Sequence, residues 1–257
     1  MKRVAVNGVH IEYVRLPSAH PRTGVPSIVF LHEGLGSLAM WKDFPQRVAD
    51  ATGCEAVVYS RAGYGRSDAA RLPRTVRYMH DEGLEVLPVF LDALGIVRPI
   101  LLGHSDGGSI ALICAGGTPT PLTALILMAP HVLVEDLSVA SIAEAKVAWE
   151  SSDLPQRLGK YHADAEAAFR GWNDIWLHPD FRAWNIEEYL PNIRCPILAI
   201  QGEDDQYGTM DQIERIAAQA ADVDLLKLAD CRHSPHKDQP EAVIEAVQNF
   251  VARILDY

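Results

Sequence analysis

Short apolar segments that alternate with amphipathic ones from residue 28 onward are the feature that most constrains the fold of this chain. Several, such as Ala56–Tyr59, contain almost no polar residue, which is typical of strands buried on both faces. Strands joined by helices in this way form a mostly parallel sheet with helices on both faces. The expected strands are Ile28–His32, Ala56–Tyr59, Ile100–Leu102, Leu125–Met128, Ile197–Ile200 and Val223–Leu228, and the expected helices are Met40–Ala51, Thr75–Leu94, Gly107–Ala115, Met210–Ala221 and Pro240–Leu255.

Two segments depart from this alternation. Val4–Val6 and Ile11–Arg15 flank Asn7-Gly8, a pair typical of tight hairpin turns, so an N-terminal hairpin is expected. Residues 131–191 are expected to be helical with no clear strand, and they hold four of the five tryptophans, Trp149, Trp172, Trp176 and Trp184. Two interpretations are open together: a helical excursion with its own small core, or a lid that lines an apolar cleft.

The charge of the chain excludes several kinds of partner. Its 34 Asp and Glu outnumber its 23 Lys and Arg, for a net charge of −11, and its basic residues form no dense cluster. Nucleic-acid binding needs clustered cations, and an anionic membrane would repel such a chain. The hydrophobic content of 48% is that of a globular protein, and no apolar run is long enough to span a bilayer.

The cysteines and the N-terminus bear on location. Met1–Arg15 lacks the apolar core of a signal peptide, and the scattered Cys54, Cys114, Cys195 and Cys231 are more typical of reduced thiols than of a disulfide framework. We therefore expect a cytoplasmic protein, and homo-oligomerisation is left open. The Cys231–His236 stretch has metal-ligating residue types, but no second ligand cluster faces it, so no metal site is expected.

The strongest chemical signal is Gly103-His104-Ser105-Asp106-Gly107, a G-x-S-x-G sequence between an expected strand and an expected helix. A nucleophile in this position sits on a sharp turn, where a Cβ on either flanking residue would clash, so glycines are needed. The turn lifts the serine hydroxyl to the carboxyl edge of the sheet, where ligands bind in such folds. Ser105 is therefore the predicted nucleophile.

A serine hydroxyl needs a base, and the base needs an orienting acid. His233 lies just after the last expected strand, and His236 lies three residues on. The preceding strand ends in Glu203-Asp204-Asp205, which offers three carboxylates. The chain order Ser, acid, His fits this architecture, although the residues alone do not say which carboxylate acts.

The loop Leu31–Ser37, with the sequence L-H-E-G-L-G-S, follows the first central strand. Its glycines allow backbone N–H groups to point into a cavity. Together with the N–H of Asp106 they could form an oxyanion hole, whose donors match the charge of a tetrahedral intermediate.

At this point the chain resembles the α/β-hydrolase superfamily over nearly its whole length. The motifs that carry the resemblance lie in the family's order: His32-Glu33-Gly34 in the oxyanion loop, Gly63-x-Gly65-x-Ser67 after the next strand, the elbow at Ser105, the strand ending in Gly202-x-x-Asp205, and His233 ahead of Pro240-Glu241. The resemblance places the acid on Asp205 and the base on His233. It implies an α/β-hydrolase core over 1–130 and 192–257 with a helical cap at 131–191.

Two residues depart from the family pattern. Glu33 occupies a place that is usually glycine, so the oxyanion donor is expected to be the N–H of Gly34, with Leu35 as the alternative. Asp106 follows the nucleophile, as in valacyclovir-hydrolase-like enzymes, which act on amino-acid esters. Its carboxylate could pair with a substrate ammonium, but stabilisation of its own helix N-terminus is the favoured interpretation.

The resemblance implies a serine hydrolase that cleaves a small to medium carboxylic ester or thioester through an acyl-enzyme, without cofactor or metal. Expected substrate contacts are Glu33, Trp149, Trp172, Trp176 and Trp184. The alternatives are C–C bond hydrolysis of a vinylogous diketone by the same residues and a hydrolase fold that only binds a ligand. Because Ser234 follows His233 where C–C hydrolases usually carry tryptophan, the first alternative is disfavoured.

Overall fold

The computed structural model describes residues 1–255. An eight-stranded sheet runs through it in the order β1-β2-β4-β3-β5-β6-β7-β8, and only β2 is antiparallel to its neighbours. The mostly parallel sheet predicted from the alternation is confirmed. The strands are β1 (Lys2–Val6), β2 (Val9–Leu16), β3 (Ile28–Leu31), β4 (Ala56–Tyr59), β5 (Ile100–His104), β6 (Ala124–Met128), β7 (Ile197–Gly202) and β8 (Val223–Leu228).

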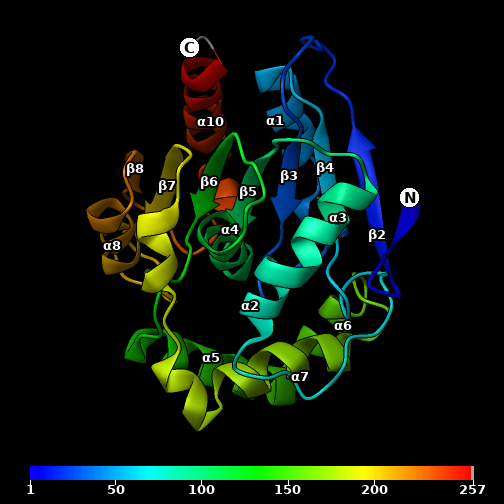
Figure 1. Ribbon diagram of the computed structural model, residues 1–257. Helices are drawn as coiled ribbons and strands as arrows, with labels where there is room; N and C mark the ends of the chain where they lie inside the picture. Colours follow the sequence, from blue (N-terminus) through cyan, green and yellow to red (C-terminus); the bar gives the residue numbers. More distant parts are fainter. Residues whose placement is uncertain (256–257) are drawn as a thin grey trace.

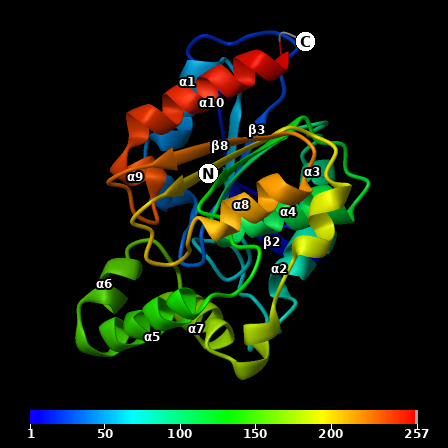
Figure 2. The ribbon, with the colours of Figure 1, turned by 90° about the vertical axis from the view of Figure 1, so that its left-hand side faces the viewer.

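Helices cover both faces of the sheet and give the molecule three layers (Figures 1 and 2). On one face α1 and α10 pack side by side over an apolar cluster that includes Phe30 and Phe250. On the other face α4 and α8 cover a larger cluster that includes Leu101 and Ile213. The core helices are α1 (Phe44–Thr52), α2 (Tyr78–Asp81), α3 (Leu87–Ala93), α4 (Asp106–Gly117), α8 (Asp211–Gln219), α9 (Pro235–Asp238) and α10 (Pro240–Leu255).

Two expected helices are broken by local geometry. Instead of one helix over Met40–Ala51, a 3₁₀ turn η1 (Leu38–Trp41) ends at Lys42, whose φ is +54°, and α1 starts two residues later. The helix expected over Thr75–Leu94 contains the π-helical turn η2 (Glu82–Val86) between α2 and α3. Pro88 explains this turn, because proline has no N–H to donate and its ring excludes the carbonyl four residues earlier.

Residues 131–191 form mainly helices, as predicted, and lie beyond the carboxyl ends of the strands (Figure 1). One isolated bridge joins Leu133 to Asn185 where the segment leaves and rejoins the sheet. Among residues 1–255, no helix has both the length and the apolar character to cross a membrane. The elements of the segment are α5 (Asp136–Ser151), α6 (Leu154–Leu158), α7 (Ala165–Trp176) and the 3₁₀ turns η3 (Pro179–Ala183) and η4 (Glu187–Asn192).

Candidate active site

Ser105 sits on a strained turn between β5 and α4. Its φ of +53° and ψ of −121° are unusual for a residue with a side chain. A Cβ on Gly103 would lie 2.4 Å from the carbonyl oxygen of Gly107, and a Cβ on Gly107 would lie 2.1 Å from that of Leu31. Both glycines are thus required by close backbone approach, which is the packing the elbow sequence predicts.

The three residues predicted as nucleophile, base and acid lie within hydrogen-bond distance of one another. The Ser105 Oγ is 3.0 Å from the His233 Nε2. The His233 Nδ1 is 2.8 Å from one Asp205 carboxylate oxygen and 2.9 Å from the other. Because Asp205 accepts from Nδ1–H, Nε2 is free to take the hydroxyl proton.

The structure distinguishes the three consecutive carboxylates. Glu203 and Asp204 are exposed, whereas Asp205 is buried and accepts further hydrogen bonds from the Gln201 side chain and the Tyr207 N–H, both at 2.7 Å. Burial alone would raise the pKa of Asp205. The charge and hydrogen bond of His233, with the Tyr207 N–H, outweigh burial and hold this pKa below its ordinary value. Asp205 is therefore held as an anion beside the imidazole.

Further groups hold His233 in place. The His104 Nε2 donates a hydrogen bond to the backbone carbonyl oxygen of His233 at 2.7 Å. The rings of Tyr207 and His131 lie 4.7 and 5.8 Å from the His233 ring, measured between centroids. His233 is thus held by hydrogen bonds to its carbonyl oxygen and its Nδ1, and by contacts of its ring with the rings of Tyr207 and His131.

Backbone donors lie where an oxyanion hole is expected. Asp106 is the first residue of α4, so its N–H has no acceptor one turn earlier in the helix. The N–H groups of Gly34 and Leu35 have no acceptor in residues 1–255. A Cβ on Gly34 would lie 2.2 Å from the Trp172 ring, so only glycine allows α7 to approach this loop so closely.

The Asp106 side chain is not available to a substrate. It is fully buried, its Oδ2 accepts a 2.7 Å hydrogen bond from the Tyr78 hydroxyl, and the Arg61 guanidinium lies 3.8 Å away. The idea that Asp106 pairs with a substrate ammonium therefore fails. This carboxylate is instead held in the protein interior by Tyr78 and Arg61.

Ser105 opens into a cavity of about 150 Å³ between the sheet edge and the helices of residues 131–191. Trp172 and Trp176 line it from one face of α7. The two other tryptophans expected there pack elsewhere. Trp149 stacks on Phe169 with centroids 4.3 Å apart, and Trp184 stacks on Phe181 at 5.5 Å, so both belong to the core of this helical segment.

Glu33, a predicted substrate contact, lines the cavity, but it is not a free anion. Its carboxylate lies 3.6 Å from the His104 Nδ1 and 3.7 Å from the Lys237 Nζ. Burial disfavours the charged form, yet the hydrogen bond and charge of His104 and the charge of Lys237 prevail, and the pKa lies well below its ordinary value. Glu33 thus places a negative charge at the cavity wall.

Five lining residues were not predicted as site residues from the sequence: His104, His131, Ile142, Tyr207 and Ser234. Tyr207 lies two residues after Asp205, and His131 follows β6 at the same sheet edge as Ser105. That position was a usable signal, because the carboxyl ends of parallel strands meet at one edge. Among the described residues, no group of three or more His, Cys, Asp or Glu side chains could hold a metal ion.

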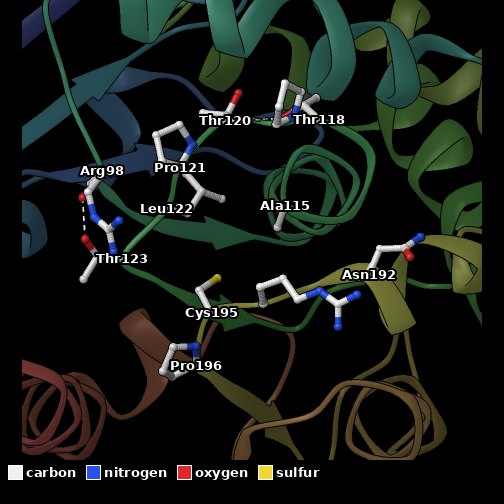
Figure 3. A pocket seen from close by; sticks show the side chains of 12 residues that line it. Arg98, Ala115, Thr118, Thr120, Pro121, Leu122, Thr123, Asn192, Cys195 and Pro196 are labelled. Atoms are coloured by element: carbon white, nitrogen blue, oxygen red, sulfur yellow. Dashed lines mark hydrogen bonds between the residues drawn. The ribbon is translucent and has the colours of Figure 1, made fainter.

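A larger cavity, of about 440 Å³, lies at the opposite edge of the sheet (Figure 3). Arg98, Thr123 and Pro196 line it, just ahead of β5, β6 and β7. None of the predicted site residues lines this cavity, whereas Ser105 and His233 line the smaller one.

The fold and the nucleophile elbow define a hydrolase of the α/β-hydrolase type, and comparison with known proteins agrees. Residues 28–246 match the Alpha/beta hydrolase family, and the chain belongs to that family.

The chain is similar to several proteins that are named as hydrolases or lactonases. It is 26% identical to a Caulobacter sp. (strain K31) protein named "Putative carbamate hydrolase RutD", over 98% of both chains. It is 22% identical to a 2-hydroxy-6-oxo-6-phenylhexa-2,4-dienoate hydrolase of Burkholderia cepacia, over 88% of this chain and 87% of that one. Its fold matches the enol-lactonase of Burkholderia xenovorans LB400 with a TM-score of 0.76 and 20% identity, over 98% of this chain and all of the other.

Proposed function

We propose that the protein is a serine hydrolase that cleaves a small to medium carboxylic ester or thioester through an acyl-enzyme intermediate. The observation that carries the proposal is the continuous hydrogen-bonded chain from Ser105 through His233 to Asp205. Such a chain activates a hydroxyl that would otherwise be a weak nucleophile.

In this mechanism the Ser105 Oγ attacks the substrate carbonyl while the His233 Nε2 takes its proton. The N–H groups of Asp106 and of Gly34 or Leu35 stabilise the oxyanion, and Asp205 stabilises the imidazolium. His233 then protonates the leaving group. A water molecule, deprotonated by His233, releases the acid and restores Ser105.

The cavity supports a small acyl group. Its volume of about 150 Å³ suits a short acyl chain, and Trp172 and Trp176 give it apolar walls. We propose that residues 131–191 act as a cap, since α5 and α7 supply one side of this cavity.

C–C bond hydrolysis would use the same three residues, and relatives bearing that activity are among those similar to this chain. The dienoate in their names is a carboxylate. Here the described residues that line the cavity include neither lysine nor arginine, so the cavity offers no such cation to bind a substrate carboxylate. This charge pattern favours a neutral ester.

The test is hydrolysis of a p-nitrophenyl ester series from acetate to octanoate by the wild type and Ser105→Ala. An acyl-CoA, an aminoacyl ester, a carbamate ester and a vinylogous diketone are assayed alongside. Ser151→Ala is the matched control, since Ser151 is exposed on α5. We expect short esters to be hydrolysed by the wild type and the control but not by Ser105→Ala. Turnover that survives in Ser105→Ala would contradict the proposal, and turnover of the diketone alone would replace it with C–C hydrolysis.

A further inference from the structure

His131 is a buried polar residue in the cavity that the proposed mechanism does not use. It follows β6, lines the cavity beside Ser105 and is 3% exposed. Its backbone is fixed by Ser109, whose hydroxyl donates to the His131 carbonyl oxygen at 2.6 Å and accepts from the His131 N–H at 3.1 Å. The imidazole is therefore held in a set position.

The ring of His131 has unused hydrogen-bonding capacity. Its Nδ1 is buried without a partner, and no group within residues 1–255 hydrogen-bonds its Nε2. Burial, reinforced by the charge of His233, lowers the pKa of His131 to about 3, so the ring is neutral at physiological pH. A neutral imidazole offers one donor and one acceptor. The Nδ1 is fully buried beside Gly208, whereas the Nε2 is not, so the Nε2 is the nitrogen that a molecule in the cavity can reach. Because buried polar groups are nearly always paired, an unpaired nitrogen at the cavity wall points to a ligand.

The position of His131 indicates which part of a substrate it would contact. The rings of His131 and Tyr207 both lie beside the His233 ring, and the Tyr207 hydroxyl also has no hydrogen-bond partner among the described residues. The leaving-group oxygen must come within hydrogen-bond reach of the His233 Nε2 to be protonated. Groups beside His233 therefore contact the alcohol portion, whereas Trp172 packs on the oxyanion loop at Gly34.

We propose that His131 is a specificity-determining residue that hydrogen-bonds a hydroxyl group on the alcohol portion of the substrate. The substrate class would then be small carboxylic esters of hydroxylated alcohols, such as glycol or glycerol monoesters, rather than esters of simple alkanols. This inference rests on the proposed ester hydrolysis and deepens it. An alkyl leaving group would leave the imidazole unpaired, and a hydroxyl near the ester oxygen would satisfy it.

The test compares 2-hydroxyethyl butyrate with propyl butyrate, which share the acyl group and differ by a hydroxyl in place of a methyl. Release of butyric acid is followed by titration at constant pH. One neutral hydrogen bond predicts that kcat/KM for the hydroxyethyl ester exceeds that for the propyl ester by about tenfold. His131→Phe should bring this ratio close to one, and His131→Asn, which keeps a donor and an acceptor, should retain part of it.

Ile142→Val is the matched control, because Ile142 lines the same cavity with no polar atom, and its ratio should match the wild type. His131→Leu replaces the Phe variant if that variant loses its cooperative unfolding transition. A wild-type ratio near one, or equal losses on both esters in the apolar variants, would overturn the inference. The experiment distinguishes ester hydrolysis by Ser105 from selection of a hydroxylated alcohol by His131. Ser105-dependent turnover of p-nitrophenyl butyrate without a preference for the hydroxyethyl ester would support the first and overturn the second.

Discussion

Replacing Asp205 with asparagine exchanges one carboxylate oxygen for an amino group where three donors converge. The carboxylate accepts from the His233 Nδ1, the Gln201 side chain and the Tyr207 N–H at 2.7–2.9 Å. An amide has a single oxygen, so at least one of these donors must face the new NH₂ group. If His233 loses its acceptor, the tautomer with a free Nε2 is no longer favoured.

The expected effect on rate is large. Loss of the orienting anion should lower kcat on p-nitrophenyl butyrate by about 10⁴-fold, the loss seen when the acid of a Ser-His-Asp triad is replaced by asparagine. The unsatisfied buried donor should also cost about 1–3 kcal/mol of unfolding free energy, measured in urea. Asp204→Asn is the control, since that carboxylate is exposed one residue away, and it should change neither quantity appreciably. A kcat for Asp205→Asn within tenfold of the wild type would refute the assignment of the acid.

Three further predictions concern backbone approach, pH and the cavity wall. Gly107→Ala places a Cβ 2.1 Å from the Leu31 carbonyl oxygen, so it should destabilise the fold by several kcal/mol and lower the urea midpoint; an unchanged midpoint would contradict the elbow packing. His131 has a lowered pKa of about 3, so below pH 6.5 the unfolded state binds a proton that the native state excludes. The contribution of His131 to stability should therefore fall by about 1.4 kcal/mol per pH unit as the pH drops from 6.5 towards 3, and His131→Phe should remove that share of the total slope; equal slopes in the wild type and the variant would contradict it. Gly34→Ala should abolish ester turnover because its Cβ would lie 2.2 Å from Trp172, whereas Gly159→Ala should keep full turnover and serves as the control, since Gly159 is exposed, has a φ of −59° and would bring its Cβ no closer than 3.3 Å to another atom.

Much of the fold could be predicted from the sequence because its strands are buried on both faces. Segments such as Ala56–Tyr59 must be covered by helices, and their order restricts the topology. Helix interruptions were harder to predict. The π-helical turn over Glu82–Val86 depends on how the chain accommodates Pro88 while α2 and η2 pack against α4. The spacing of apolar residues in the sequence does not indicate such packing.

The candidate site likewise has some residues that the sequence predicts well and others that it does not. Ser105, Asp205 and His233 stand at fixed places relative to strands, so their convergence follows from topology. Which residues line the cavity does not follow from topology. Trp172 and Trp176 are one helical turn apart and share a face of α7, a spacing that could have singled them out, whereas Trp149 and Trp184 lie on other elements and pack into the core.

The central claim is that Ser105 is a nucleophile activated by His233. Its most direct measurement is intact-mass analysis after treatment with a fluorophosphonate, followed by peptide mapping, on the wild type and Ser105→Ala. We predict one phosphonyl group per chain, attached to Ser105 and absent from the variant. No adduct on the folded wild type, or an equal adduct on Ser105→Ala, would contradict it.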